Sequence, residues 1–566
     1  MKRINLEPFK RFWAIAKLYW LGNEKKGAIC LLALLALLLL SFTWMNVVLN
    51  TKSGELITAL SNQDKTRFYG DIKILFGLLI IATPMGAAYS YLGDKLGLFW
   101  RRWLTNHFMG EYFGERSFYK ISNFYPDIDN PDQRISQDLN SFCLESLNFF
   151  LLIISATSTV IAFSGVLWLI SKPLVFFLLI YAVSGTLIAT GFFGKKLVKL
   201  NYLQLQKEAN FRFGLVRIRE NAESIAFYQG EEREFNQTSQ LFQVLYNNFN
   251  KLILWQRFYL GMFTNAYGYI PIILPFLVVG PSVFSGDLEV GKVSEAAGAF
   301  SAVFGSLNVI VANFQGLTSF VAGIDRLYEF HTYIKTNTKV GEMRRGEHRT
   351  IDTRQDSNLT IEHLTLQTPN YQRTLFNDVS FTLEPGQGLL VMGASGCGKS
   401  SLLRAIAGLW NSGTGAIVRP PLKEMLFLPQ RPYMILGTLR DQLLYPNVNA
   451  EIKDEEIQKV LEKVNLPDLV AKQGGLHVKQ DWSDVLSLGE QQRVAFARLL
   501  ISQPKYAILD ESTSALDVNN EETLYRHLLD TDTTFISVGH RPTLKEYHHV
   551  MLDLLAGGKW ELSQLN

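Results

Sequence analysis

A run of eight residues carries the clearest chemistry in the sequence. It consists of Gly393, Ala394, Ser395, Gly396, Cys397, Gly398, Lys399 and Ser400, and it matches the G-x-x-x-x-G-K-[ST] pattern of a phosphate-binding loop. The apolar stretch 389–392 before it is typical of a buried strand, and the stretch 401–407 after it is typical of a helix. Glycines let such a loop curl so that successive N–H groups face phosphates at the start of the helix. The run predicts binding of a nucleoside triphosphate.

The end of this loop supplies the groups for phosphate and metal. Lys399 is expected to reach the β- and γ-phosphates, and the Ser400 hydroxyl is expected to hold Mg²⁺. Ser401, in the first turn of the predicted helix, belongs to the same nucleotide-binding set.

Two adjacent carboxylates end another apolar stretch, 506–509. Asp510 is predicted to hold Mg²⁺ directly or through water. Glu511 points to the other face of the strand end, where it can polarise an attacking water. An acidic strand end without chemistry is the alternative, and the phosphate-binding loop earlier in the chain argues against it.

Length and composition limit the classes of protein that come into question. The 566 residues exceed one compact domain, so two large units are expected. A net charge of +3 gives no indication of nucleic-acid binding. Three scattered cysteines, Cys30, Cys143 and Cys397, lack the spacing of a metal site or disulfide framework and indicate a reducing environment for the loop thiol.

The N-terminal part has the pattern of a protein that crosses a lipid bilayer. Residues 9–20 suit an amphipathic helix in the membrane interface better than a signal peptide. Six apolar stretches long enough to span follow, at about 27–49, 74–93, 147–170, 174–194, 258–284 and 297–324. The long connections between them, about 94–146 and 195–257, carry the basic pairs Arg101–Arg102 and Lys195–Lys196. The positive-inside rule places both connections and both termini in the cytosol.

The composition also predicts the domain organisation. A helical transmembrane domain is expected over 1–340 and a charged linker over 341–357. From 358 to 566, short β-rich runs at 359–366, 389–392, 424–428, 506–509 and 534–538 alternate with helical patterns. This alternation predicts an α/β nucleotide-binding domain.

A further motif gives a family resemblance. Leu486–Arg493 reads LSLGEQQR and resembles the signature motif of the ABC ATPases. The resemblance implies that ATP is the nucleotide, that Ser487 and the Gly489 backbone meet the γ-phosphate, and that Glu490 belongs to the same nucleotide-binding set. Leu488 replaces a glycine and Glu490 a glutamine of the common pattern.

Other segments resemble further motifs of the same family. Gln430 resembles the Q-loop glutamine, which implies a role in catalysis and at Mg²⁺, and His540 resembles the switch histidine. Residues 514–517 resemble the D-loop. Tyr371 lies where an aromatic residue stacks on adenine in the family, and Phe376 is the alternative candidate.

In this family each ATP lies between the phosphate-binding loop of one subunit and the signature motif of another. A chain with one copy of each is therefore expected to act as a half-transporter in a dimer. A homodimer is the economical assembly, and pairing with a different half-chain is the alternative.

The membrane part narrows the resemblance. Residues 130–135 and 219–230 resemble the D subfamily of ABC transporters and its bacterial relatives. That group implies an exporter-type fold, a bacterial inner membrane location with the nucleotide-binding domain in the cytosol, and ATP-driven transport of hydrophilic compounds such as cobalamin or peptides, with import expected. The alternatives are a long-chain fatty acid or acyl-CoA transporter and an ATP-gated channel or regulatory protein. Coupling helices are expected near 125–134 and 222–231.

The centres of the predicted spans contain no ionisable side chain. This favours ATP as the only energy source, because proton-coupled carriers use intramembrane carboxylates and histidines. It also predicts that neutral polar and aromatic residues of the spans line a cavity. The alternative is that these residues form hydrogen bonds between helices. The candidates are Asn46, Tyr89, Asn265, Tyr267, Tyr269, Asn308, Asn313 and Gln315.

Overall fold

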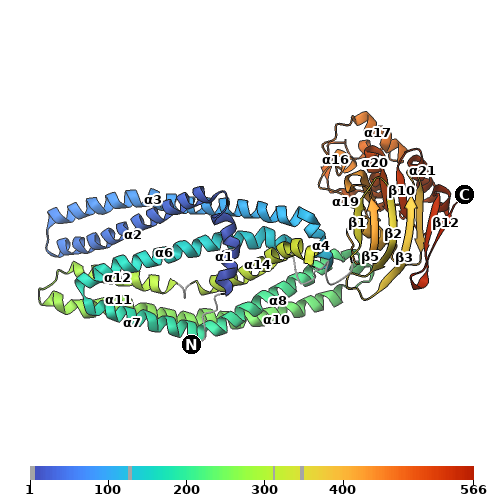
Figure 1. Cartoon of the computed structure of the whole chain (residues 1–566). Coiled ribbons are helices and arrows are strands. Elements are labelled where there is room, and N and C mark those ends of the chain that lie inside the picture. The colour runs from blue at the N-terminus through green and yellow to red at the C-terminus, as the bar shows by residue number, and fades with distance from the viewer. Residues whose placement is uncertain (1–6, 125–130, 310–312, 344–349, 566) are drawn as a thin grey trace. The chain divides into compact units, whose positions relative to one another are not determined.

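The computed structural model describes residues 7–124, 131–309, 313–343 and 350–565. The chain divides into two compact units, Met1–Thr338 and Lys339–Asn566 (Figure 1). Each unit is described by itself.

The N-terminal unit is built from long helices. They are α1 (Glu7–Trp20), α2 (Lys25–Ser61), α3 (Lys65–Phe113), α6 (Leu139–Ile170), α7 (Lys172–Ile188), α8 (Lys195–Glu220), α10 (Glu231–Ile253), α11 (Gly261–Phe284), α12 (Gly291–Leu307) and α14 (Phe314–Met343). The π-helical turns η3 (Ala189–Gly194) and η4 (Leu254–Leu260) join α7 to α8 and α10 to α11 without a break.

Five continuous helices in the described residues are long and apolar enough to cross a membrane. They cover Lys25–Ser61, Lys65–Asn123, Pro131–Ile170, Lys172–Glu220 and Glu231–Phe284, and each contains one of the first five predicted spans. The sixth, 297–324, includes residues 310–312, which lie outside the described residues. The count of six is therefore not confirmed.

The two connections expected as long loops are largely helical. The C-terminal part of α3 lies in the first, and α8 and α10 occupy most of the second. Their charged sequences lack the apolar runs that mark a span, but polar sequences that are good helix formers extend a helix beyond the bilayer.

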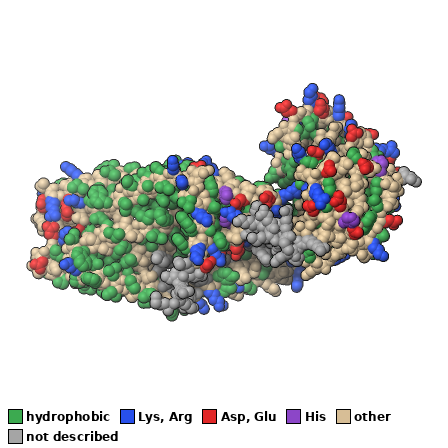
Figure 2. Space-filling view, viewed as in Figure 1, with side chains coloured by type: hydrophobic (Ala, Val, Ile, Leu, Met, Phe, Trp, Pro, Cys, Tyr) green, Lys and Arg blue, Asp and Glu red, His purple; other side chains and the backbone are tan. Residues whose placement is uncertain are grey.

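The surface of the N-terminal unit is apolar along its spans, as the hydrophobic side chains in Figure 2 show. Leu169 is 87% exposed and Phe284 is 92% exposed. Such a surface suits lipid rather than water. In α1, Ile15, Ala16 and Tyr19 are buried, whereas Phe9 and Trp13 are exposed, as an amphipathic interface helix requires.

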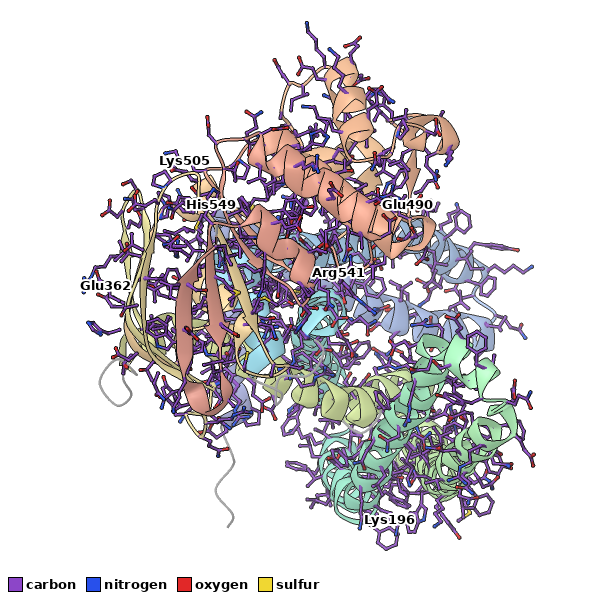
Figure 3. The ribbon with its side chains drawn as sticks, turned by 90° about the vertical axis from the view of Figure 1, so that its right-hand side faces the viewer. Lys196, Glu362, Glu490, Lys505, Arg541 and His549 are labelled. Atoms are coloured by element: carbon purple, nitrogen blue, oxygen red, sulfur yellow. The ribbon has the colours of Figure 1, made fainter. Side chains whose placement is uncertain are left out.

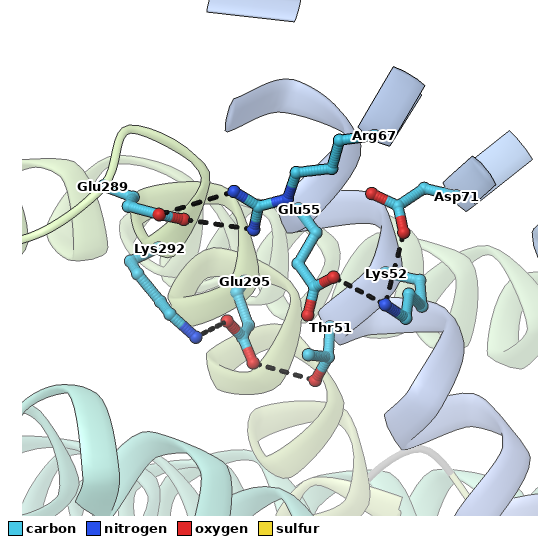
Figure 4. Close-up of polar contacts among 8 residues, drawn as sticks. All are labelled: Thr51, Lys52, Glu55, Arg67, Asp71, Glu289, Lys292 and Glu295. Atoms are coloured by element: carbon cyan, nitrogen blue, oxygen red, sulfur yellow. Dashed lines mark hydrogen bonds and ion pairs between the residues drawn. The ribbon is translucent and has the colours of Figure 1, made fainter. Parts of the chain in front are cut away.

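Charged residues of this unit gather at helix ends, where α2, α3 and α12 meet (Figure 4). The contacts are Lys52 Nζ to Glu55 Oε2 (2.6 Å) and Asp71 Oδ1 (3.2 Å), Arg67 Nη2 to Glu289 Oε2 (3.4 Å), Lys292 Nζ to Glu295 Oε2 (2.6 Å) and Thr51 Oγ1 to Glu295 Oε1 (2.8 Å). Gly54 and Gly291 let α2 and α12 approach here, because a Cβ on Gly291 would lie 1.8 Å from Gly54 O.

The C-terminal unit contains two larger sheets. One has the order β1-β5-β2-β3, formed by β1 (Asp352–Gln355), β5 (Gly413–Arg419), β2 (Leu359–Gln367) and β3 (Thr374–Leu383). The other has the order β12-β11-β4-β10-β9-β6, formed by β12 (Trp560–Gln564), β11 (Val550–Leu554), β4 (Gly388–Gly393), β10 (Thr534–Val538), β9 (Tyr506–Asp510) and β6 (Met425–Leu428). β1 lies in the range that composition assigns to the linker and pairs in parallel with β5.

Parallel pairing in the six-stranded sheet determines where the site lies. β11, β4, β10, β9 and β6 are all parallel to their neighbours, and only β12 is antiparallel. The carboxyl ends of these strands therefore meet at one edge, which is where open α/β sheets bind ligands. The helices α15 (Lys399–Ile406), α20 (Leu488–Ser502) and α21 (Val518–Leu529) pack on this framework.

His548 makes the stability of the C-terminal unit dependent on pH. Its Nδ1 lies 2.6 Å from Leu544 O, and burial lowers the pKa of its imidazole to about 4. The imidazole stays neutral in the folded state, whereas in the unfolded chain it takes up a proton near pH 6.5. The free energy of unfolding is therefore highest above about pH 6.5 and decreases as the pH falls toward 4. The loss amounts to about 3 kcal/mol at most.

We expect the urea midpoint of this unit in detergent to fall between pH 7 and pH 5. The midpoint should fall less in a His548→Leu variant than in the unmodified chain. In His477→Gln it should fall as much as in the unmodified chain, because the side chain of His477 is 75% exposed. An equal fall in the His548→Leu variant would contradict the assignment.

Candidate nucleotide site

The phosphate-binding loop connects β4 to α15 in a conformation that requires its glycines. Gly393 has φ 136° and Gly398 has φ 111°, both in the left-handed region. A Cβ on Gly393 would lie 2.5 Å from Leu554 O. Lys399 is only 6% exposed, and its Nζ donates to Gly393 O (2.8 Å) and Ala394 O (3.1 Å). The loop thus holds a buried cation among backbone carbonyls, where phosphate oxygens would give it an anionic partner.

Ser400 and Asp510 lie together beside this loop, as the sequence predicts. Ser400 Oγ donates to Asp510 Oδ1 at 3.0 Å. Burial, with a smaller contribution from Glu511, raises the pKa of the Asp510 carboxyl. A divalent cation would reverse that shift, because it stabilises the ionised carboxylate.

These two oxygens suit Mg²⁺. Among the residues that the structure describes, no group of three or more His, Cys, Asp or Glu side chains could hold a metal. Mg²⁺ is commonly held by one or two protein oxygens, and substrate phosphates and water complete its shell. The residues present therefore fit a metal that arrives with the nucleotide.

Glu511 lies between the other two predicted catalytic side chains. Gln430 Nε2 donates to Glu511 Oε2 at 2.9 Å, and His540 Nε2 lies 3.2 Å from Glu511 Oε1. Glu511 has φ 48°, a left-handed conformation that is uncommon for this residue type and typical of functional sites. Its N–H donates to Val538 O at 3.0 Å, which fixes the turn. Gln430, Glu511 and His540 follow β6, β9 and β10, so the sheet edge brings all three together.

The adenine candidates have different environments. Phe376 is fully buried in the core between the sheets and has no free face for a base. Tyr371 is partly exposed and has φ 57° in the loop between β2 and β3. Of the two rings, that of Tyr371 is the one a base could reach.

The signature residues form the start of α20. Ser487 is its N-cap and makes a capping box with Glu490: Glu490 N donates to Ser487 Oγ (3.3 Å), and Ser487 N donates to Glu490 Oε2 (2.9 Å). The Ser487 hydroxyl also donates to Glu490 Oε2 (2.8 Å). A Cβ on Gly489 would lie 3.3 Å from Ala515 O. Figure 3 labels Glu490 at the N-terminal end of α20.

Two side chains that the motifs did not single out also hold this edge together. Arg541, labelled in Figure 3, is one of them. Its Nη2 donates to Leu516 O at 2.7 Å, and its Nη1 lies 3.5 Å from Glu521 Oε1. Gln492 bonds Gln430 O through its amide. Gln492 lies within the segment 486–493 and Arg541 directly follows His540, but only tertiary structure shows their partners.

The expected coupling segments and cavity residues are in part described. α9 (Ala222–Phe227) forms within 222–231, and Phe227 is 78% exposed. Residues 125–130 of the other segment and the side chain of Gln315 lie outside the described residues.

Tyr267 takes part in helix packing. Its hydroxyl donates to Tyr181 O (2.6 Å), and the hydroxyl of Tyr181 donates to Tyr267 O (2.7 Å). The hydrogen bonds join α7 to α11, as the alternative interpretation of the polar groups expects. Asn265 and Tyr269 line a shallow groove of about 430 Å³ on α11.

Comparisons with known proteins agree with this geometry. Residues 15–284 match the family model described as ABC transporter transmembrane region 2, and residues 376–514 match the model described as ABC transporter. An ABC transporter ATP-binding protein of Synechocystis is 47% identical over 95% of this chain and 82% of its own length. ABC transporter D family member 2, chloroplastic, of Arabidopsis thaliana is 39% identical over 96% of this chain and 86% of its own. The human lysosomal cobalamin transporter ABCD4 is 32% identical over 100% of this chain and 97% of its own.

The fold and the site define an ATP-binding protein with its own membrane-spanning helices, and the chain belongs to the ABC transporter family. More particularly, it is a half-transporter of the D-subfamily type, which couples ATP hydrolysis to transport.

Proposed function

We propose that two copies of this chain form an ATP-driven importer of a hydrophilic solute, with cobalamin or a peptide as the leading substrate classes. The observation that carries the proposal is the presence of one phosphate-binding loop and one signature in a single chain. Two sites are complete only when two chains each contribute both halves. We further propose six spans, with the sixth in 297–324, and a location in a bacterial inner membrane.

The proposed site divides the chemistry among the residues of this edge. Lys399 and the loop N–H groups would bind the β- and γ-phosphates. Ser400, Asp510 and Gln430 would hold Mg²⁺, which would offset the negative charge of the phosphates. Glu511 accepts a proton from the attacking water, and His540 holds the Glu511 carboxylate in place. Ser487 and Gly489 of the second chain close over the γ-phosphate.

The substrate class is supported by the relatives and by the composition of the spans. The human relative named as a cobalamin transporter matches over the whole of this chain. The centres of the predicted spans lack ionisable side chains, which suits a bulky solute without strong charge. Acyl-CoA is the second candidate, on the resemblance to the D subfamily.

The test is transport of labelled cobalamin, a labelled peptide and labelled acyl-CoA, in intact cells and in inverted vesicles, by the unmodified chain and by Glu511→Gln. We expect ATP-dependent accumulation of cobalamin or peptide in cells, and none in the variant. Accumulation in inverted vesicles alone would overturn import, accumulation of acyl-CoA alone would overturn the substrate class, and equal transport by both proteins would overturn the ATP-driven mechanism.

Glu490 is expected to weaken ATP binding in the dimer. Its carboxylate accepts the Ser487 hydroxyl and would face the γ-phosphate across the closed site. Glu490→Gln keeps a capping side chain but removes the charge, so the KM for ATP should fall about threefold to tenfold. Glu490→Ala, which also removes the acceptor for Ser487 N in the capping box, should destabilise the unit by about 1 kcal/mol. Steady-state ATPase kinetics and thermal melting measure the two effects, and a higher KM in Glu490→Gln would contradict the prediction.

A further inference from the structure

Gln492 lies in the second turn of α20 and is fully buried. Its Nε2 donates to Gln430 O (2.9 Å) and to Ser514 Oγ (3.3 Å), and its Oε1 accepts from Ala515 N (3.0 Å). The amide therefore joins α20 to the segment that carries Gln430 and to the segment 514–517. A buried amide with all these partners fixes the distances between the three segments.

Both segments lead directly to Glu511. The side chain of Gln430 donates to Glu511 Oε2 (2.9 Å), and Ser514 N donates to Glu511 O (3.1 Å). A shift of Gln492 would therefore reach the Glu511 side chain through Gln430 and the Glu511 backbone through Ser514. Gln492 contacts neither of the Glu511 groups itself, so it acts by position.

The same helix begins with the signature. Ser487 caps α20, and the close approach of Gly489 to Ala515 O places the first turn of the helix against the segment that Gln492 bonds. A short, buried connection therefore links the start of α20 to Gln430 and to the segment 514–517.

We propose that Gln492 is a positioning residue that couples the two ATP sites of the dimer. When the signature of one chain closes on the ATP held by its partner, α20 moves, and Gln492 sets Gln430 and Glu511 of the ATP site on its own chain. The inference rests on the proposed function, because it requires a site completed by a second chain. It assigns to Gln492 a role that neither the motif nor the site chemistry supplies.

Two substitutions distinguish the effect of the Gln492 hydrogen bonds from the effect of its packing in the core. Gln492→Met keeps the length of the side chain and removes every hydrogen bond. Gln492→Glu keeps the acceptor for Ala515 N and removes the donors to Gln430 O and Ser514 Oγ. The matched control is Gln458→Met in the helix α17 (Asp454–Lys463), away from the loop and the signature, whose Nε2 donates to Pro467 O (2.8 Å).

The experiment measures ATPase kinetics of the full-length chain in proteoliposomes, with the affinity for a fluorescent ATP analogue and the melting temperature. We expect kcat to fall about 10- to 100-fold in both Gln492 variants, with the analogue affinity within about twofold of the unmodified chain. The Hill coefficient for ATP should fall to about 1, while Gln458→Met keeps both kcat and cooperativity.

Different results would overturn the inference and the proposed function. A kcat close to that of the unmodified chain would overturn the inference. A fall in kcat that is matched by equal losses of analogue affinity and melting temperature would also overturn it, because it would show a structural role. Normal cooperativity in an otherwise slowed variant would also overturn it. An unmodified chain without ATPase activity would overturn the proposed function itself.

Discussion

Replacing Glu511 with glutamine is expected to lower the steady-state ATPase rate by about 100- to 10,000-fold, the range for loss of a general base. The carboxylate lies within hydrogen-bond reach of Gln430 Nε2 and His540 Nε2, at 2.9 Å and 3.2 Å. Glutamine has the same length but cannot accept a proton from water. ATP affinity should therefore be kept, and solute transport should stop with hydrolysis.

Phosphate release measures the hydrolysis rate, and binding of an ATP analogue measures the affinity, both on one sample. The matched control is Glu424→Gln, which breaks the ion pair with Lys505 Nζ (2.9 Å) and should leave the rate unchanged. Hydrolysis within tenfold of the unmodified chain would contradict the role of Glu511. A conductance that stays open in the variant would favour an ATP-gated channel over a transporter.

The second large effect is expected from Lys399→Met. The ammonium is 6% exposed and bonds only the carbonyls of Gly393 and Ala394 among the described contacts, so bound phosphates are its natural counter-charge. Removing it should weaken ATP binding by about 2–5 kcal/mol, the usual cost of truncating one partner of a buried charge pair. The unliganded chain should melt no lower than the original, because a buried cation without a carboxylate does not stabilise a fold.

Titration with a fluorescent ATP analogue and thermal melting without nucleotide test both parts. Lys505→Met is the control, since that side chain is 70% exposed. An affinity within about twofold of the original would show that Lys399 does not bind phosphate.

Local patterns predicted much of the nucleotide-binding unit. The strands expected at 389–392, 506–509 and 534–538 correspond to β4, β9 and β10. The first two are short apolar runs, and the third also contains Thr534 and Ser537. All three are largely buried, as strands covered on both faces are. Because the strands are parallel neighbours, the polar residues at their carboxyl ends meet, and Glu511 lies beside Gln430 and His540.

Other features depend on tertiary structure. Gln491 and Gln492 are adjacent and alike in sequence, but the rotation of α20 leaves the first partly exposed and buries the second. The capping box of Ser487 and Glu490 has a recognisable S-x-x-E pattern, which the resemblance to the signature motif obscured. The helices that continue beyond the spans were missed because hydropathy marks the bilayer and not the end of a helix.

The central claim is that each ATP site is built from two chains, and mixing two inactive variants tests it most directly. Lys399→Met and Ser487→Ala each disable both sites of a homodimer, but a mixed dimer retains one intact site, formed by Lys399 of one chain and Ser487 of the other. Co-reconstituted in equal amounts, the two variants should recover ATPase activity above that of either variant alone and at most about a quarter of the original, because about half of the dimers are mixed, each has one of two sites, and coupling between the sites slows a site that works alone. Activity no higher than that of either variant alone would contradict the shared site.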